Sequence, residues 1–281
     1  MRYTIKHFRS QFGTDEACLQ FLFDERFGPQ YVCKKCDKSG LYHPISKRKG
    51  YACSCGEQVN PAAGTILHKS ETKLTDWFFA IFLMSQSRNG VSAKELERHL
   101  GVTYKTAWRV CKQIRKLMAQ SPSMLSGTVE ADGTYIGGKR RLKHKMENKS
   151  AVVGLVERKG SVLAQKVDAE DTFTLLPLVR KNVAIGSFVF SDEHPTYKKL
   201  PQFGYSHDYI THSKDQYVRG EIHTNTIEGF WSQVKRSIDG TYHAVSPKYL
   251  QTYLDEFVFR YNHRLEPVFP VLLARVCVQH V

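Results

Sequence analysis

The chain lacks any apolar run long enough to cross a membrane. Its longest strongly apolar run, residues 77–84, has eight residues, whereas a membrane-spanning helix needs about 20. The first twelve residues also lack the apolar core of a secretory signal. We therefore expect a cytoplasmic protein that makes no contact with a membrane.

Acidic residues are scarce for a chain of 281 residues. There are 27 Asp and Glu against 41 Lys and Arg, which leaves a formal net charge of +14. Such an excess favours a polyanionic partner, and nucleic acid is the commonest partner of this kind. The remaining composition, with 41% hydrophobic and 24% charged residues, excludes a disordered or collagen-like chain. Its length leaves room for two or three globular units.

The seven cysteines do not suit a disulfide scaffold, because their number is odd and their spacing uneven. Three stand alone and are expected to be small buried hydrophobic residues: Cys18, Cys111 and Cys277. The other four form two close pairs: Cys33, Cys36, Cys53 and Cys55. Two thiolate pairs joined by a hairpin can supply all four corners of a tetrahedral Zn²⁺ site. The pattern predicts a zinc ribbon that its structural metal keeps folded, with four unligated thiols as the alternative.

Residues 75–118 have the pattern of three short helices. Thr75 can cap the first helix, Ser92 can cap the second, and Gly101 separates the second from a basic third helix. Helix, glycine turn and basic helix is the layout of a helix-turn-helix, in which the last helix enters the DNA major groove. A plain helical bundle with a solvated basic face is the alternative. The expected DNA contacts are Tyr104, Lys105 and Arg109.

From residue 127 onward, strand-like and helix-like segments follow one another. Strands are expected over 128–136, 151–156, 162–167, 187–191 and 205–211, and helices over 172–183, 225–238 and 249–260. This order suits a mixed sheet with helices on its faces.

Two aspartates occupy places where such sheets form functional sites. Asp132 lies in the first strand, and Asp192 lies at the carboxyl end of a later apolar strand. Carboxylate oxygens are the ligands that Mg²⁺ takes, and two such cations can stabilise the attacking and leaving oxygens of a phosphoryl transfer. Glu130 competes with Asp132, because residues two apart on a strand face the same way. The spacing therefore predicts a metal–carboxylate site and leaves Glu130 as an alternative first acid.

A third ligand is expected from the amphipathic helix over 225–238. Asn225 and Glu228 lie three residues apart on one face, and Lys235 follows Glu228 two turns later. A structural alternative is a capping box, since Asn225 is a good N-cap and Glu228 would then stand at N3.

Several motifs, taken together and in order, resemble those of one known family. Besides the ribbon cysteines they are GVSAKEL at 90–96, YKTAWR at 104–109, VEADGTYIGG at 129–138, SDEH at 191–194, HTNTIEGFWS at 223–232, GTYH at 240–243 and FVFRYN at 257–262. With these motifs the chain resembles bacterial insertion-sequence transposases of the DDE type, in the branch with an N-terminal zinc ribbon. The resemblance spans about residues 31–264.

The resemblance implies an RNase H-like catalytic domain in which Asp132 and Asp192 are the first two acids. The third position in this branch is Asn, His or Glu, so Asn225 and Glu228 both match. Glu228 is the expected residue, because an ionised carboxylate is the stronger Mg²⁺ ligand. Lys235 is the downstream basic partner that would contact a DNA phosphate.

The resemblance also implies the chemistry and the partners. Mg²⁺ or Mn²⁺ would serve hydrolysis at the transposon ends, and the freed 3′-hydroxyls would then attack target DNA. The partners would be double-stranded DNA, as terminal inverted repeats and as target, and further copies of the chain in a synaptic complex at the bacterial nucleoid. Phosphates would be held by Lys139, Arg140, Arg141, Lys143, Lys145, Lys235 and Arg236.

The expected organisation is a multidomain α/β protein. An N-terminal helix and zinc ribbon would take residues 1–70, a helix-turn-helix unit 71–122, and an RNase H-like mixed sheet flanked by helices 123–281. Two rival functions stay open. Gly133, where members of the family often carry an acid, suits an inactivated relative that only binds DNA as a regulator. An RNase H-like nuclease that cleaves by DNA structure would need the same metals.

Overall fold

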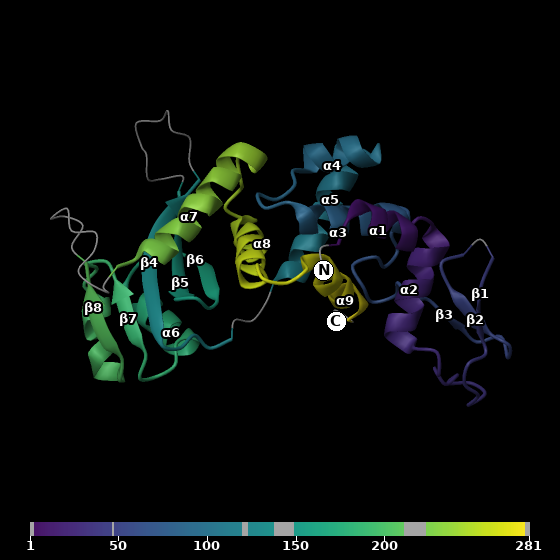
Figure 1. Cartoon of the computed structure of the whole chain (residues 1–281), viewed down its shortest axis with the longest axis horizontal. Coiled ribbons are helices and arrows are strands. Elements are labelled where there is room, and N and C mark those ends of the chain that lie inside the picture. Colours follow the sequence, from purple (N-terminus) through teal and green to yellow (C-terminus); the bar gives the residue numbers. More distant parts are fainter. Residues whose placement is uncertain (1–2, 47, 120–122, 138–148, 211–222, 279–281) are drawn as a thin grey trace. The chain divides into compact units, whose positions relative to one another are not determined.

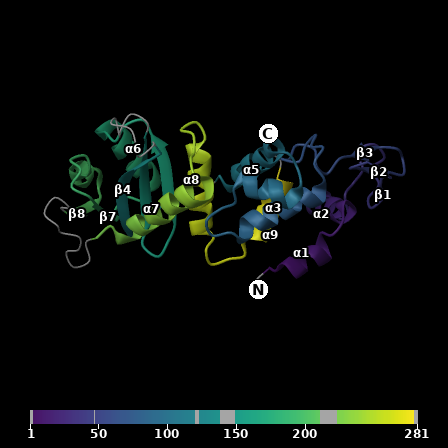
Figure 2. The ribbon, with the colours of Figure 1, turned by 90° about the horizontal axis from the view of Figure 1, so that it is seen from above.

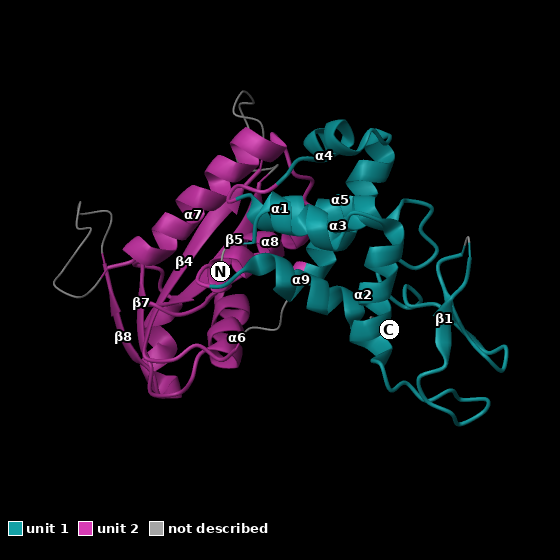
Figure 3. Cartoon of the chain, turned by 45° about the vertical axis from the view of Figure 1, so that its right-hand side comes forward, with its two compact units in different colours: residues 1–87, 91–117, 266–281 teal, residues 88–90, 118–265 magenta. Residues whose placement is uncertain are grey.

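The computed structural model describes residues 3–46, 48–119, 123–137, 149–210 and 223–278. The chain forms two compact units, which are coloured separately in Figure 3. Unit 1 comprises residues 1–87, 91–117 and 266–281, and unit 2 comprises residues 88–90 and 118–265. None of the described helices combines the length and the hydropathy that a bilayer span requires.

Unit 1 combines a small sheet with six helices in its described part. The helices are α1 (Ile5–Gln11), α2 (Asp15–Phe27), α3 (Leu74–Gln86), α4 (Ala93–Leu100), α5 (Tyr104–Met118) and α9 (Val268–Cys277). Three antiparallel strands form the ribbon in the order in which they occur in the chain: β1 (Tyr42–Pro44), β2 (Tyr51–Cys53) and β3 (Gln58–Val59). The expected ribbon and the expected three helices after it are therefore both present.

Side-chain caps explain where the helices of unit 1 begin. Ser92 accepts the N–H of Glu95 and caps α4 as predicted, and Gly101 ends this helix in the left-handed conformation, with φ of 65°. The prediction that Thr75 caps a helix is wrong, because Thr75 lies inside α3. Its N–H and its hydroxyl both donate to Asp15 Oδ1, each at 2.9 Å. Asp15 thus joins the start of α2 to the start of α3.

The core of unit 1 gathers aromatic rings from distant parts of the chain. The ring of Phe269 in α9 lies 5.5 Å from that of Phe82 in α3 and 6.0 Å from that of Phe12, centroid to centroid. Because these contacts hold α9 within unit 1, residues 266–281 group with that unit and not with the expected catalytic domain at 123–281. The expected boundaries after residues 70 and 122 stay predictions.

The three isolated cysteines lie in helices of unit 1. Cys18 in α2 and Cys111 in α5 are fully buried, as predicted. Cys277 is only half-buried instead, because it is the last residue of α9.

Unit 2 is built on one mixed sheet of five described strands. They are β4 (Thr128–Ile136), β5 (Ser150–Glu157), β6 (Val162–Val167), β7 (Phe188–Ser191) and β8 (Ser206–Tyr209), in the order β6-β5-β4-β7-β8. The first three strands pair antiparallel, whereas β7 runs parallel to β4 and β8 runs parallel to β7. This is the RNase H-like mixed sheet that the resemblance implies.

Helices cover both faces of this sheet, as Figure 1 and Figure 2 show. They are α6 (Thr172–Asn182), α7 (Asn225–Ser237) and α8 (Leu250–Asn262), with a 3₁₀ helix at Tyr197–Phe203. On one face α6 packs against a core that includes Val129 and Ala131, and on the other face α7 and α8 share a second core. Because successive strand residues face opposite sides, Glu130 and Asp132 face α7.

Candidate active site

Three acidic side chains from distant parts of unit 2 meet at the centre of the sheet. Asp132 lies in β4, Asp192 directly follows β7, and Glu228 lies in the first turn of α7. β4 and β7 are parallel neighbours, and Ala131 in β4 is paired with Ser191 in β7. Asp132 and Asp192 each follow one of these paired residues, so the two aspartates lie at the same level along the strands. Burial, and then the negative charges of Asp192 and Glu228, raise the pKa of Asp132 to about 7. Asp192 and Glu228 therefore both lie close enough to Asp132 to repel its negative charge.

The possible ligand atoms at this site suit a hard divalent cation. All three groups offer carboxylate oxygens, which are the ligands that Mg²⁺ and Mn²⁺ take. Their mutual repulsion destabilises the site, and a bound cation would remove that repulsion. Among the described residues, only the ribbon cysteines bring three or more possible ligand atoms within 4.8 Å of one another. The carboxylate site is thus more open than a closed four-ligand metal site.

The turn after β7 holds Asp192 and brings further groups to the site. The Asp192 Oδ1 accepts the backbone N–H of His194 at 3.1 Å. Tyr197 is buried beside the site, where burial and the negative charges of Asp192, Asp132 and Glu170 raise its pKa. Glu170 is a nearby carboxylate that the sequence analysis missed, because no motif surrounds it.

Glu130, the alternative first acid, has a structural role. Its side chain is fully buried and accepts a hydrogen bond from Arg158 Nε at 2.8 Å. It also accepts the backbone N–H groups of Thr226 at 2.8 Å and Ile227 at 3.0 Å, and the Thr226 hydroxyl at 2.9 Å. These N–H groups have no partner within the helix, and a negative charge is favourable at a helix start. Glu130 therefore fixes the helix that carries Glu228.

The start of α7 differs from the capping box considered for it. The N-cap is Thr224, and Asn225 is the first helical residue, with an exposed side chain. The capping-box alternative is therefore excluded, because Asn225 lies within the helix and is not its N-cap. The Thr224 hydroxyl donates to Glu228 Oε1 at 2.8 Å. Glu228 also raises the pKa of Asp132, and Asn225 lies in the same turn with its side chain exposed. The choice between them as third ligand stays a prediction.

Trp231 in α7 is a further neighbour of Asp132. It is buried, and its indole packs on Gly154, which is paired with Asp132 between β4 and β5. A Cβ at Gly154 would collide with the ring, so only glycine leaves room for it. The indole lowers the pKa of Asp132 against the larger effects of burial and charge. A glycine inside a strand of β-branched residues is the signal that could have revealed this contact.

The expected DNA contacts that the structure describes are all exposed. Tyr104 and Lys105 lie at the start of α5, and Arg109 lies one turn later, where it donates to two hydroxyls in the segment before α3. Lys235 and Arg236 lie in the last turn of α7. The contacts expected in the basic insert lie outside the described residues: Lys139, Arg140, Arg141, Lys143 and Lys145.

The four ribbon cysteines form a closed cluster. All four Sγ atoms lie within 4.8 Å of one another, with Cys33 at 3.6 Å from Cys55 and Cys36 at 3.7 Å from Cys53. A tetrahedral Zn²⁺ with Zn–S bonds of about 2.3 Å has sulfur–sulfur edges of about 3.8 Å. The cluster fits zinc and is a structural zinc site, since four thiolates leave no position open.

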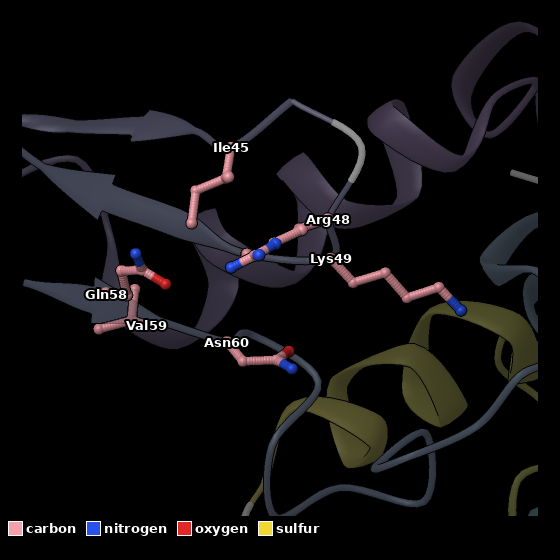
Figure 4. Close-up of a pocket in the computed structure, with 7 residues that line it drawn as sticks. Ile45, Arg48, Lys49, Gln58, Val59 and Asn60 are labelled. Carbon is pink, nitrogen blue, oxygen red and sulfur yellow. The ribbon is translucent and has the colours of Figure 1, made fainter.

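The ribbon also carries a shallow pocket, shown in Figure 4. It is lined by Ile45, Arg48, Lys49, Gly50, Gln58, Val59 and Asn60. Lys49 Nζ donates to the carbonyl oxygens of Ser70 at 3.1 Å and Thr72 at 3.0 Å, so its charge ties the ribbon to the segment before α3. None of the expected metal or DNA ligands lines this pocket.

Two family models match the parts of the chain that contain the carboxylates and the ribbon cysteines. Residues 124–262 match a family model described as the ISXO2-like transposase domain, and residues 13–58 match one described as the transposase zinc-ribbon domain. The first match contains the three carboxylates and the second contains the four cysteines.

Two relatives and one solved structure were compared with the chain. An uncharacterized protein in transposable element ISH50 of Halobacterium salinarum is 27% identical over 274 residues, 89% of this chain and 91% of that protein. An uncharacterized transposase-like protein of Haemophilus influenzae is 30% identical over 90 residues, 32% of this chain and 72% of that protein. The crystal structure of a pre-cleavage Mos1 transpososome aligns over 73% of this chain and 80% of that one, at 10% identity. Its TM-score of 0.28 is too low to carry an argument.

Proposed function

The chain belongs to the insertion-sequence transposases with an N-terminal zinc ribbon, and we propose that it cleaves the ends of its own element and joins them to target DNA. Its partners would be double-stranded DNA, as terminal inverted repeats and as target. Further copies of the chain would complete a synaptic complex, because two ends must be held together to be joined. The reaction would take place on nucleoid DNA in the cytoplasm.

The proposed reaction has two phosphoryl-transfer steps. In the first, a water oxygen bonds to the phosphorus at the transposon end, the bond to the 3′ oxygen breaks, and this oxygen leaves as a 3′-hydroxyl. In the second, the same 3′ oxygen loses its proton and bonds to a phosphorus of the target, whose own 3′ oxygen leaves. Neither step needs a covalent link to the protein, so catalysis rests on positioning and charge.

Asp132, Asp192 and Glu228 would hold the divalent cations of this reaction. When bound, Mg²⁺ or Mn²⁺ would neutralise the carboxylates and stabilise the charge on the attacking and leaving oxygens. The chain's own contribution is placement: β4 and β7 hold the aspartates side by side, and the start of α7 holds Glu228. Lys235 would contact a DNA phosphate two turns further along α7.

DNA would also be bound away from the carboxylates. The ribbon and the helix-turn-helix would recognise the terminal repeats, with Tyr104, Lys105 and Arg109 of α5 at the major groove or its phosphates. The basic insert and the pair Lys235 and Arg236 would hold further phosphates. Each such contact releases counterions, so binding should fall steeply as salt rises.

The observation that carries this proposal is the convergence of three acids from three separate elements. Burial raises the pKa of Asp132, and Asp192 and Glu228 raise it further, which supports a site where like charges lie near one another. Like charges in a partly buried place destabilise a fold unless a cation joins them. The matched transposase domain contains all three residues, which supports a polynucleotide as the substrate.

The test uses the purified full-length, zinc-loaded protein and a labelled duplex that ends in the cognate terminal repeat. With Mg²⁺ we expect cleavage at the repeat end, reduced at least about 100-fold in Asp132→Asn and in Asp192→Asn. DNA affinity should stay unchanged, because Asn keeps the shape of Asp and removes only its charge. Asp168→Asn, an exposed acid of the same unit, is the matched control and should cleave normally. Undiminished cleavage in both site variants would overturn the proposal.

The same assay separates the two rival functions. Repeat binding without cleavage in either Mg²⁺ or Mn²⁺ would favour a DNA-binding regulator. Cleavage of branched DNA regardless of the repeat sequence would favour a structure-specific nuclease. Short inverted repeats on both sides of the coding sequence would support a transposase over both.

A further inference from the structure

The segment between β6 and α6 brings another acid to the carboxylate site. Glu170 lies in this segment, and its carboxylate rests on the backbone of Gly133, the residue after Asp132. A Cβ at Gly133 would lie 2.9 Å from Cδ and Oε1 of Glu170 and 3.0 Å from its Oε2. These distances are shorter than a van der Waals contact, so the Glu170 carboxylate occupies the space that a side chain at position 133 would fill.

Glu170 lies among the groups that surround Asp132 and Asp192. Burial and the negative charge of Asp192 raise the pKa of Glu170, and His194 acts in the opposite direction. Burial, and then the negative charges of Asp192, Asp132 and Glu170, raise the pKa of Tyr197, of which 2% is exposed. Glu170 therefore lies near Asp192 and Tyr197.

Oε1 of Glu170 is buried without a hydrogen-bond partner among the described residues. A buried carboxylate that serves structure is hydrogen-bonded, as Glu130 is by Arg158 and the start of α7. A buried carboxylate oxygen without a donor is destabilising, and a cation bound to it removes that cost.

We propose that Glu170 is a fourth carboxylate ligand of the divalent cations, placed beside Asp192 and against the backbone of Gly133, the residue after Asp132. This inference rests on the proposed function, because it adds a ligand to the same metal site. A side chain at position 133 would occupy the space in which the Glu170 carboxylate lies. The carboxylate can take this position because residue 133 is glycine.

The main test measures Mn²⁺ binding to the full-length, zinc-loaded protein from the electron paramagnetic resonance signal of free Mn²⁺. Glu170→Gln keeps the shape of the side chain and removes its charge, so we expect the Kd for Mn²⁺ to rise at least about 10-fold. Asp168→Asn changes an exposed acid in the same segment and is the matched control. Its Kd should equal that of the wild type.

Thermal unfolding separates a metal ligand from a structural residue. Without Mg²⁺ or Mn²⁺ but with zinc retained, Glu170→Gln should have a higher Tm than the wild type, because a charge repelled by Asp192 is gone. Saturating Mn²⁺ should raise the Tm of the wild type more than that of the variant, since it binds the wild type more tightly. A lower Tm of the variant in both conditions would assign Glu170 to structure and overturn the inference.

Position 133 offers an independent perturbation of the same carboxylate. Gly133→Ala places a methyl group where the Glu170 carboxylate lies, and should weaken Mn²⁺ binding as much as Glu170→Gln does. The two changes combined should weaken it no further, because they remove one interaction. Gly133→Asp in the Glu170→Gln background should return a carboxylate to that space and restore most of the Mn²⁺ affinity.

Asp132→Asn, measured in parallel, separates failure of this inference from failure of the proposed function. Unchanged Mn²⁺ affinity in Glu170→Gln, together with loss of Mn²⁺ binding and of cleavage in Asp132→Asn, overturns the role of Glu170 and leaves the transposase site intact. Unchanged Mn²⁺ binding and cleavage in Asp132→Asn overturns the proposed function, and the inference with it.

Discussion

The two ligand groups of this chain are built in opposite ways. The ribbon thiolates come from residues 33–55, and all four sulfur atoms lie within 4.8 Å of one another. The carboxylates come from β4, from the turn after β7 and from α7, and among the described acids no three reach that spacing. A closed set of thiolates holds a metal that folds the chain around it, whereas an open set of carboxylates leaves room for water and a phosphate. The contrast therefore agrees with the proposed function, in which the zinc site serves folding and the carboxylate site would serve the reaction.

Removing zinc should have the largest effect. Structural zinc contributes about 10–16 kcal/mol to small zinc modules, and strands of two or three residues have little core to fold without it. In Cys36→Ser we expect the amides of β1, β2 and β3 to lose protection from hydrogen exchange, while those of β4 and β5 keep theirs. Exchange measured by mass spectrometry tests this, with Cys277→Ser as a control thiol outside the cluster. If the ribbon amides stay protected in Cys36→Ser, the ribbon does not depend on zinc for its folding.

Glu130→Gln should have the next largest effect, and it acts on the scaffold of the carboxylate site. The change removes the negative charge that pairs with Arg158, and the amide N–H₂ must face either Arg158 or the N–H groups of Thr226 and Ile227. Removing one partner of a buried pair costs about 3–5 kcal/mol, so unfolding in urea should occur at a lower concentration. The amides of Thr226 and Ile227 should also exchange faster. Asp168→Asn controls for the loss of an acid, and equal stability of both variants would show that α7 is held in another way.

The same contrast explains which features could be predicted from the sequence. The zinc ligands are close in the chain, so their spacing alone indicates the site. Asp132 and Asp192 could be placed because strand periodicity and strand ends are local features, and parallel pairing of β4 with β7 then brings them together. Ser92 and Gly101 mark helix ends by their own conformational preferences.

The features that could not be predicted depend on contacts between residues far apart in the chain. Glu170 has no motif, and it reaches Gly133 only through the packing of the segment between β6 and α6. Glu130 has the spacing of a site residue, but the start of α7 uses its charge. The apolar stripe of α9 could bury itself against any core, and the rings around Phe269 decide that it joins unit 1.

A smaller effect is expected from the protonation of Asp132 when Mg²⁺ and Mn²⁺ are absent. Burial, Asp192 and Glu228 raise its pKa from 3.8 to about 7, so the folded chain holds this proton more tightly than the unfolded chain. The protonation of Asp132 contributes its full stabilisation below pH 3.8, the pKa of the unfolded chain, and this stabilisation is lost as the pH rises through about 7. The wild type should therefore have a higher Tm at pH 6 than at pH 8.

Asp132→Asn should reduce this pH dependence and raise the free energy of unfolding at pH 8 by on the order of 2 kcal/mol. Thermal unfolding at both pH values, in buffer without chelator so that zinc is retained, measures the difference. The same pH dependence in Asp132→Asn and in the wild type would mean that another group titrates, and that the repulsion at the carboxylate site is weaker than the fold indicates.

The smallest effects are expected from single exposed lysines, which compare DNA binding in the two units. Lys105→Ala in α5 and Lys235→Ala in α7 should each lower the slope of log affinity against log salt by about one, the value for one lost phosphate contact. Fluorescence anisotropy over a range of KCl concentrations measures that slope. The two variants should differ in single-turnover cleavage of saturated complexes, because Lys235 lies on the helix that carries Glu228 and Lys105 lies in the other unit. Lys235→Ala should slow this step and Lys105→Ala should not. If both variants slow cleavage equally, DNA recognition and cleavage are not divided between the two units. The two metal sites would then differ only in their ligands.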